Sequence, residues 1–171
     1  FGYWSKNETG KLEYTSLFFK EPLKESPLLP IFSKIKEVNG KILFQTFQQI
    51  FIFDPLKNTL DSISALKGFN LLFSSNNRVF IQDTGMGLFE ITENNRSLIK
   101  GTDQVKFHIV GVVAENTKAL LVVTRDNGIW GWKNNVFSKK QWVINDVIEK
   151  HLANNVQVLD NNYLVIGTIR N

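Results

Sequence analysis

Apolar and polar positions recur along this chain in a unit that is repeated. Each unit has a short apolar run, a turn rich in Gly, Asn or Gln, a second apolar run and then a polar stretch. The clearest units cover residues 41–54, 78–91 and 119–132, and a further unit begins at residue 163. Short apolar runs bounded by turn residues are typical of β-strands. We therefore predict an all-β fold made of short strands.

The spacing of the units indicates the architecture. The equivalent positions Lys41, Arg78, Lys118 and Tyr163 follow one another at intervals of 37, 40 and 45 residues. A period of about 40 residues that contains only short strands is typical of a β-propeller, whose blades are four-stranded antiparallel sheets. The sequence therefore predicts a partial β-propeller with about four blades' worth of chain, as three whole blades and two halves.

We expect a single propeller segment over residues 1–171. Whole blades are expected at residues 31–64, 69–100 and 107–142, and half blades at residues 1–17 and 156–171. The first half resembles the two outer strands of a blade, and the second half the two inner strands. The halves could formally pair and close a four-bladed ring. A chain that begins and ends within a repeat is interpreted more simply as a piece of a longer propeller.

The third whole blade shows the expected order of burial. From the propeller axis outward, its strands are expected at residues 109–114, 119–124, 128–132 and 136–142. The two inner runs are continuously apolar, which suits strands covered on both faces by neighbouring blades, whereas the outermost run is polar. Trp130 and Trp132 alternate onto one face, where we expect them to fill the space between blades rather than to stack on a sugar.

Two stretches depart from the repeat. Residues 21–30 contain three prolines, which exclude a regular strand and predict an extended loop between blades. Residues 145–153 carry apolar positions at helical spacing, with Asn145 as the expected N-cap of a helix. Either insertion could cover a binding site, although a surface loop of tolerated length is the commoner case.

The composition is that of a globular protein. Of 171 residues, 43% are hydrophobic and 12% aromatic, which is enough for a substantial core. No apolar run approaches the roughly 20 residues that cross a bilayer. The start at Phe1 has neither an initiator Met nor a signal-peptide pattern, which implies a processed or excised segment. The absence of Cys excludes disulfides, Cys-ligated zinc and thiol nucleophiles.

The charge gives no reason to expect nucleic acid as a partner. The net charge is +4, but the lysines are spread through turns and strand edges, and only Lys139 and Lys140 are adjacent. A nucleic-acid interface usually gathers its basic residues on one face. Lysines scattered in this way are more typical of exposed strand edges that must not pair with other chains.

Residues that could carry catalysis or hold a metal form no recognisable pattern. His108 and His151 are not spaced as a metal pair, and the chain has no nucleophilic serine elbow and no calcium loop. Asp83, Glu90 and Asp126 could supply a glycosidase pair, but each is explained by a turn or a strand edge. We therefore expect no catalytic residues, no metal, no cofactor and no enzyme activity in this segment.

The turns between second and third strands are the first candidates for binding a ligand. They are expected to ring the central channel, over which the ligands of propellers usually lie. The residues at their tips are Gln48, Asp83, Arg125, Asp126 and Arg170. The arginines suit carboxylate or sulfate, because the guanidinium group is a bidentate donor. The alternative is that these are solvated turn residues without a ligand.

The repeats resemble those of a known group of sensor proteins. Residues 162–168, Asn-Tyr-Leu-Val-Ile-Gly-Thr, resemble the Asp-Gly-x-Leu-Trp-Ile-Gly-Thr signature of two-component-regulator propeller repeats, with Asn for Asp-Gly and Val165 for Trp. Residues 121–130 fit the same frame. Residues 2–7 and 12–17 are also similar to Bacteroidetes sensor-regulators that carry a propeller, a triple-tyrosine-motif domain, a membrane helix and a LuxR-type or histidine-kinase output. The likeness covers essentially the whole chain.

This resemblance implies a ligand-sensing, periplasmic segment of a transmembrane protein that regulates transcription. The segment would be attached to the inner membrane through parts outside this sequence, and the full-length protein would be a homodimer. The ligand would be a small molecule or an oligosaccharide, since glycan fragments are common in this group. No kinase, receiver or DNA-binding motif lies within the chain.

Two other functions stay open at this stage. The same repeats and polar turns suit a propeller scaffold that binds other proteins. A propeller-type polysaccharide lyase or hydrolase is the third alternative, and it would require His108, His151 or the pair Asp83 and Asp126 to converge on one cleft.

Overall fold

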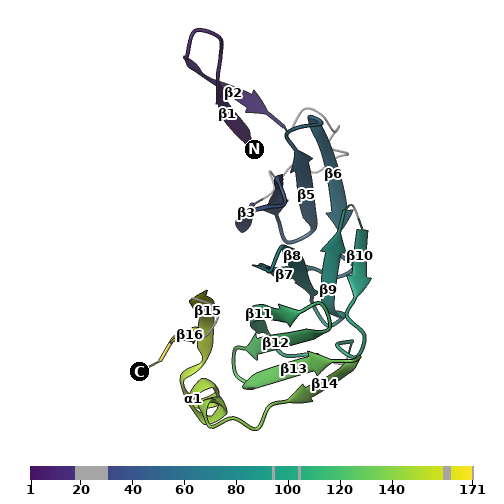
Figure 1. Ribbon diagram of the computed structural model, residues 1–171, viewed down its shortest axis with the longest axis vertical. Coiled ribbons are helices and arrows are strands. Elements are labelled where there is room, and N and C mark those ends of the chain that lie inside the picture. The colour runs from purple at the N-terminus through teal and green to yellow at the C-terminus, as the bar shows by residue number, and fades with distance from the viewer. Residues whose placement is uncertain (18–30, 94, 104, 160–162, 171) are drawn as a thin grey trace.

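The computed structural model describes residues 1–17, 31–93, 95–103, 105–159 and 163–170. Within these residues, three four-stranded sheets and two two-stranded sheets lie side by side in an open arc (Figure 1). Every pairing of neighbouring strands is antiparallel. The prediction of an all-β partial propeller is confirmed.

Each whole blade is a meander in which consecutive strands pair. The first blade consists of β3 (Lys34–Val38), β4 (Lys41–Gln45), β5 (Gln49–Asp54) and β6 (Thr59–Ser64). The second consists of β7 (Phe69–Ser75), β8 (Arg78–Asp83), β9 (Gly87–Thr92) and β10 (Asn95–Leu98). The third consists of β11 (Ile109–Asn116), β12 (Ala119–Thr124), β13 (Ile129–Lys133) and β14 (Val136–Lys139).

The arc ends in two hairpins, which we call the N-terminal hairpin and the C-terminal hairpin. The N-terminal hairpin is β1 (Gly2–Lys6) with β2 (Leu12–Ser16), and the C-terminal hairpin is β15 (Ala153–Leu159) with β16 (Tyr163–Thr168). The innermost strands β3, β7, β11 and β15 line the concave side of the arc, and β6, β10 and β14 lie on its convex side (Figure 1).

The core is divided among the junctions between successive sheets. Between the second and third blades, Phe73, Phe80 and Leu88 pack against Val112, Leu120 and Val122. Trp130 and Trp132 are partly buried in this same cluster, which confirms that they fill the space between blades. A similar cluster lies at each of the other junctions. Since one sheet cannot cover its own apolar faces, the stacking of blades supplies most of the burial.

Hydrogen bonds between turns reinforce the junctions. The side chains of Asn39, Asn76 and Arg78 donate to the backbone carbonyls of Asn77, Ala114 and Asn116, at 3.0, 2.5 and 3.0 Å. Each bond spans 38 residues, which is one repeat of the fold. The turns between first and second strands are therefore fastened to one another from blade to blade.

Two details of the sequence prediction are wrong. The outermost strand of the third blade ends at Lys139 and does not extend to residue 142. Beyond it the chain turns toward α1 (Ile144–His151), and the backbone N–H of Asn145 donates to Trp142 O at 3.0 Å. The expected helix is present, but Asn145 lies within its first turn, and the N-cap position is Val143 without a side-chain cap.

The reason is that Asn145 bonds to the blade instead of capping the helix. Its Oδ1 accepts from Ile129 N at 2.8 Å, and its Nδ2 donates to Lys140 O at 2.5 Å. This side chain thereby holds α1 against the third strand of the blade. The loop expected over residues 21–30 lies outside the described residues. In the part of the chain that the structure describes, no helix is long and apolar enough to span a bilayer.

Candidate ligand-binding groove

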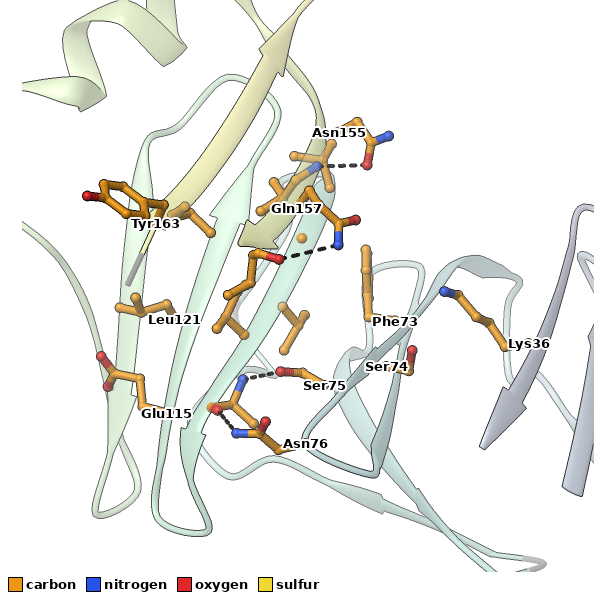
Figure 2. A pocket seen from close by; sticks show the side chains of 18 of the residues that line it. Lys36, Phe73, Ser74, Ser75, Asn76, Glu115, Leu121, Asn155, Gln157 and Tyr163 are labelled. Atoms are coloured by element: carbon orange, nitrogen blue, oxygen red, sulfur yellow. Dashed lines mark hydrogen bonds between the residues drawn. The ribbon is translucent and has the colours of Figure 1, made fainter. Parts of the chain in front are cut away.

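A groove of about 1100 Å³ lies on the concave side of the arc. Its walls are the innermost strands of all three blades and of the C-terminal hairpin, so it crosses three junctions between sheets. Figure 2 shows Lys36, Phe73 and Gln157 directed toward this space from three different sheets. A ligand in the groove would therefore contact several blades at once.

Some polar groups of the groove already hold the blades together. Ser75 Oγ accepts from Ala114 N at 3.0 Å, and Asn76 Nδ2 donates to Ala114 O at 2.5 Å (Figure 2). Asn155 Oδ1 accepts from Val156 N at 2.8 Å, whereas Gln157 makes only a long bond of 3.4 Å to Val158 O. Gln157 and the exposed hydroxyl-bearing Ser74 are thus the polar groups best placed to bind a ligand.

Two lysines give one end of the groove a positive charge. Lys34 and Lys36 alternate along β3, and both lie in the groove wall. Lys34 Nζ lies 5.6 Å from the centroid of the Phe73 ring on the next blade. Burial lowers the pKa of Lys34, and the like charge of Lys36 lowers this pKa further. An anion bound between the two ammonium groups would oppose both effects on the pKa, because an opposite charge favours the protonated form of Lys34.

The residues expected to bind a ligand from the sequence do not line this groove. Gln48, Asp126 and Arg170 are exposed in turns. The backbone of Arg125 donates to His108 O at 2.8 Å and accepts from Ala153 N at 2.7 Å, so this turn is tied to its neighbours. The structure brings together Arg125, Asp126 and His108: burial and the charge of Arg125 lower the pKa of His108, against an opposing effect of Asp126.

Asp83 is engaged in holding two blades together. Its side chain is fully buried, and its oxygens accept from the backbone N–H groups of Leu66, Lys67 and Gly68 at 2.7, 3.1 and 3.1 Å. Arg96 adds an ion pair of 2.8 Å. Burial alone would raise the pKa of Asp83, but these hydrogen bonds outweigh it and lower the pKa. Both carboxylate oxygens thus have partners within the chain.

A simple sequence signal could have located the groove. The innermost strands of the second and third blades are largely apolar, but the equivalent strand of the first blade reads Lys-Ile-Lys-Glu-Val. A basic strand in a position that is usually apolar indicates a polar lining of the channel. Its short alternating pattern is not a continuous apolar run, so the signal that marks the other inner strands does not mark this one.

Nothing in the described residues forms a metal site: no group of three or more His, Cys, Asp or Glu side chains could hold an ion. His151 has a hydrogen-bonding partner of its own, because its Nδ1 lies 3.1 Å from Arg170 O.

Comparison with known proteins identifies solved structures that share the fold of this chain. No protein-family model matches the sequence, and no curated protein does. The N-terminal domain of Nup159 is similar over 81% of this chain and 39% of that chain, with a TM-score of 0.53 and 14% identity. BamB from Moraxella catarrhalis is similar over 79% of this chain and 40% of that chain, with a TM-score of 0.54 and 12% identity.

A third similar structure is that of S. cerevisiae Dbp5 bound to Nup159, Gle1, IP6 and ADP. It matches over 81% of this chain and 39% of that chain, with a TM-score of 0.52 and 13% identity. At such identities the likeness shows the fold alone. The chain is a β-propeller repeat protein, and it spans about two fifths of the length of the propeller chains it matches.

Proposed function

We propose that this chain is the ligand-binding part of a sensor protein, and that the groove takes an acidic, hydroxyl-rich ligand such as a carboxylated or sulfated oligosaccharide. The observation that carries this proposal is the pair Lys34 and Lys36, held on one strand beside Phe73 in the groove. The rest of the lining is largely aliphatic, and it also carries hydroxyl and amide groups and one carboxylate, that of Glu115. Ammonium groups attract the anion, and the hydroxyl and amide groups match sugar hydroxyls.

The position of the groove suits sensing because its walls belong to different blades. A ligand that touches several blades binds best to one arrangement of them, and it can shift that arrangement by no more than its differential affinity. The resemblance to two-component-regulator propeller repeats supports this role. Under this proposal the segment is periplasmic, it is not an enzyme, and its output domain and membrane helix belong to parts outside the sequence. A full reading frame without a membrane helix would count against it.

Calorimetric titration with matched oligosaccharides tests the groove. We expect oligogalacturonate or a sulfated disaccharide to bind, and a neutral oligosaccharide of the same length to bind at least about tenfold more weakly, since a charge-assisted hydrogen bond contributes about 1.5–3 kcal/mol. The double variant K34A/K36A should lose this preference. The control K57A/K118A removes two exposed turn lysines outside the groove and should keep it. Equal binding by the two variants would refute the proposal.

A second candidate is a scaffold that binds other proteins. Two observations favour it: a similar propeller, Nup159, is seen with Dbp5 bound to it, and both hairpins of this chain expose large apolar side chains. Pull-down of a stable protein partner, together with no thermal shift in a screen of oligosaccharides, would support the scaffold over the sensor.

A further inference from the structure

A second hollow, of about 360 Å³, lies beside the groove, between the first and second blades. Its walls are the end of β3, the end of β7 and the turns that follow these strands, and we call it the turn hollow. Ser74, Ser75 and Asn76 line both hollows, so the turn hollow continues the groove. Its volume falls within the range of about 300–1,000 Å³ that is usual for small-molecule sites.

The turn hollow lies at a junction that is fastened by fewer hydrogen bonds than the next one. Val38 ends β3 and pairs with Lys41, and in the second blade the same places belong to Ser75 and Arg78. Ser75 and Arg78 both bond to the backbone of the third blade, at 3.0 Å each. Val38 has no polar side-chain group, and in the described part of the chain Lys41 makes no hydrogen bond to the second blade. This junction therefore keeps room for a ligand that the next junction fills with its own side chains.

The turn hollow is lined mainly by amide and hydroxyl groups, unlike the largely aliphatic groove. Asn39 donates from Nδ2 to Asn77 O at 3.0 Å, which leaves its Oδ1 able to accept. The hydroxyl of Ser74 and the side-chain amide of Asn77 bond to no other group in the described residues. Each of these two groups can both donate and accept, as the hydroxyl groups of an uncharged sugar also do.

The groove and the turn hollow also differ in charge. Lys34 and Lys36 line the groove, whereas the charged residue that lines the turn hollow is Glu37. Glu37 Oε1 accepts from Gly40 N at 2.9 Å, which holds the carboxylate at the turn beside the hollow. This carboxylate would repel an anionic group of a ligand placed there, but not an uncharged unit.

We propose that the groove and the turn hollow form one site for a mixed oligosaccharide, with an acidic unit at Lys34 and Lys36 and an adjoining uncharged unit in the turn hollow. Lys36 and Val38 are two residues apart on β3, a rise of about 7 Å, so neighbouring units of one ligand can reach both parts. This inference rests on the function proposed above, and it narrows the ligand to chains that join acidic to neutral sugars. A chain made only of acidic units would place a carboxylate near Glu37.

Calorimetric titration with disaccharides of equal length tests this division of the site. The probes are digalacturonate, digalactose and the two disaccharides that join one galacturonate to one galactose in either order. We expect the better of the two mixed disaccharides to bind about threefold more tightly than digalacturonate, as one exposed charge contact would give, and digalactose to bind most weakly. E37Q keeps the acceptor for Gly40 N but removes the charge, so it should abolish this preference. Digalacturonate that binds the wild type as tightly as both mixed disaccharides would overturn the proposal.

A glycine substitution tests the amide group of the turn hollow. Asn77 has a positive φ of 58°, so N77G removes the amide without straining the turn. N77G should weaken binding of the better mixed disaccharide about fivefold, which is the order expected for a lost hydrogen bond. The matched control N135G changes an exposed asparagine with a φ of 64° in a turn of the third blade, and it should leave the affinity unchanged. Equal affinities of N77G and N135G would remove the turn hollow from the site.

The same titrations separate this inference from the proposed function. If K34A/K36A weakens binding of the acidic disaccharides but E37Q and N77G change nothing, the groove binds the ligand and the division of the site proposed here is wrong. If no acidic disaccharide binds the wild type, the proposed function and this inference both fail. A threefold preference that disappears in E37Q, together with weaker binding by N77G, would support both.

Discussion

Gln45 and Gln82 hold equivalent places in the second strands of two successive blades, and each bonds to the innermost strand of the blade that follows. Gln45 donates to Asn70 O and accepts from Leu72 N at 2.9 Å. Gln82 donates to Phe107 O at 2.8 Å and accepts from Ile109 N at 3.0 Å. Each primary amide thus acts as a peptide group that joins one sheet to the next, and both side chains are buried.

Removing either glutamine should destabilise the propeller at one junction. Q45A leaves the N–H of Leu72 and the carbonyl of Asn70 without their partner, and a buried unsatisfied group costs about 1–3 kcal/mol. We expect the free energy of unfolding in urea to fall by about 2–4 kcal/mol. Q48A changes an exposed turn residue of the same blade and should stay within about 0.5 kcal/mol. Equal effects of Q45A and Q48A would exclude this role for Gln45.

The ion pair of Asp83 and Arg96 predicts a stability that depends on pH. The folded-state pKa of Asp83 is lowered from its ordinary value of 3.8, so the stabilisation by its carboxylate is complete above that value and is lost as the pH falls through the folded-state pKa. D83N should lower the free energy of unfolding by about 3 kcal/mol at neutral pH, as loss of a buried partner does.

The difference between D83N and the wild type should shrink as the pH falls from 3.8 through the lowered folded-state pKa, because the unfolded wild-type chain takes up its proton first and the folded carboxyl follows. Urea unfolding at neutral and acid pH measures this. D126N changes an exposed carboxylate in the equivalent turn of the third blade and serves as the control. A D83N penalty that persists unchanged at acid pH would show that the hydrogen-bond geometry of the side chain matters, and not its charge.

The strands and their order could be predicted from the sequence because the chain repeats itself. Continuous apolar runs such as residues 119–124 mark strands that are covered on both faces, and this property is local. The roles of Asn145 and Asp83 could not be predicted, since an amide at a helix start and a carboxylate in a turn can each bond in several ways. The contacts that decide between them come from Ile129 and from residues 66–68.

The basic strand β3 is a sequence signal for the groove, but the side-chain contacts inside the groove are harder to predict than the hydrogen bonds of Gln45 and Gln82. Gln45 and Gln82 recur at an interval of 37 residues within the repeat, which is a usable signal of a shared structural role. The proximity of Lys34 to Phe73 depends instead on which strands face each other across a junction. Sequence spacing gives the order of blades but not the side chains that meet between them.

Trp130 and Trp142 together offer a direct test of packing between blades. Trp130 stacks on Phe137 with ring centroids 5.0 Å apart and donates from Nε1 to Asn127 O at 3.1 Å. W130A should therefore cost about 3 kcal/mol of unfolding free energy. Trp142 lies beyond the outermost strand and is 44% exposed, so W142A should cost less than about 1 kcal/mol. The reverse order of the two costs would contradict the described junction.

The pKa of Lys34 can be measured by NMR of its side-chain carbon during an alkaline titration. We expect a value below the ordinary 10.5, because the ammonium group is partly buried and Lys36 adds a like charge. K36A should raise this pKa without restoring 10.5, since burial is the larger cause and remains. K57A, a change in an exposed turn, should leave the pKa of Lys34 unchanged.

Because an anion binds the protonated form of Lys34, the affinity of the groove for an anion should decline as the pH rises through the lowered pKa, before an ordinary lysine would lose its charge. Addition of the anionic oligosaccharide should in turn raise the pKa of Lys34, and a ligand that binds without moving it would lie elsewhere.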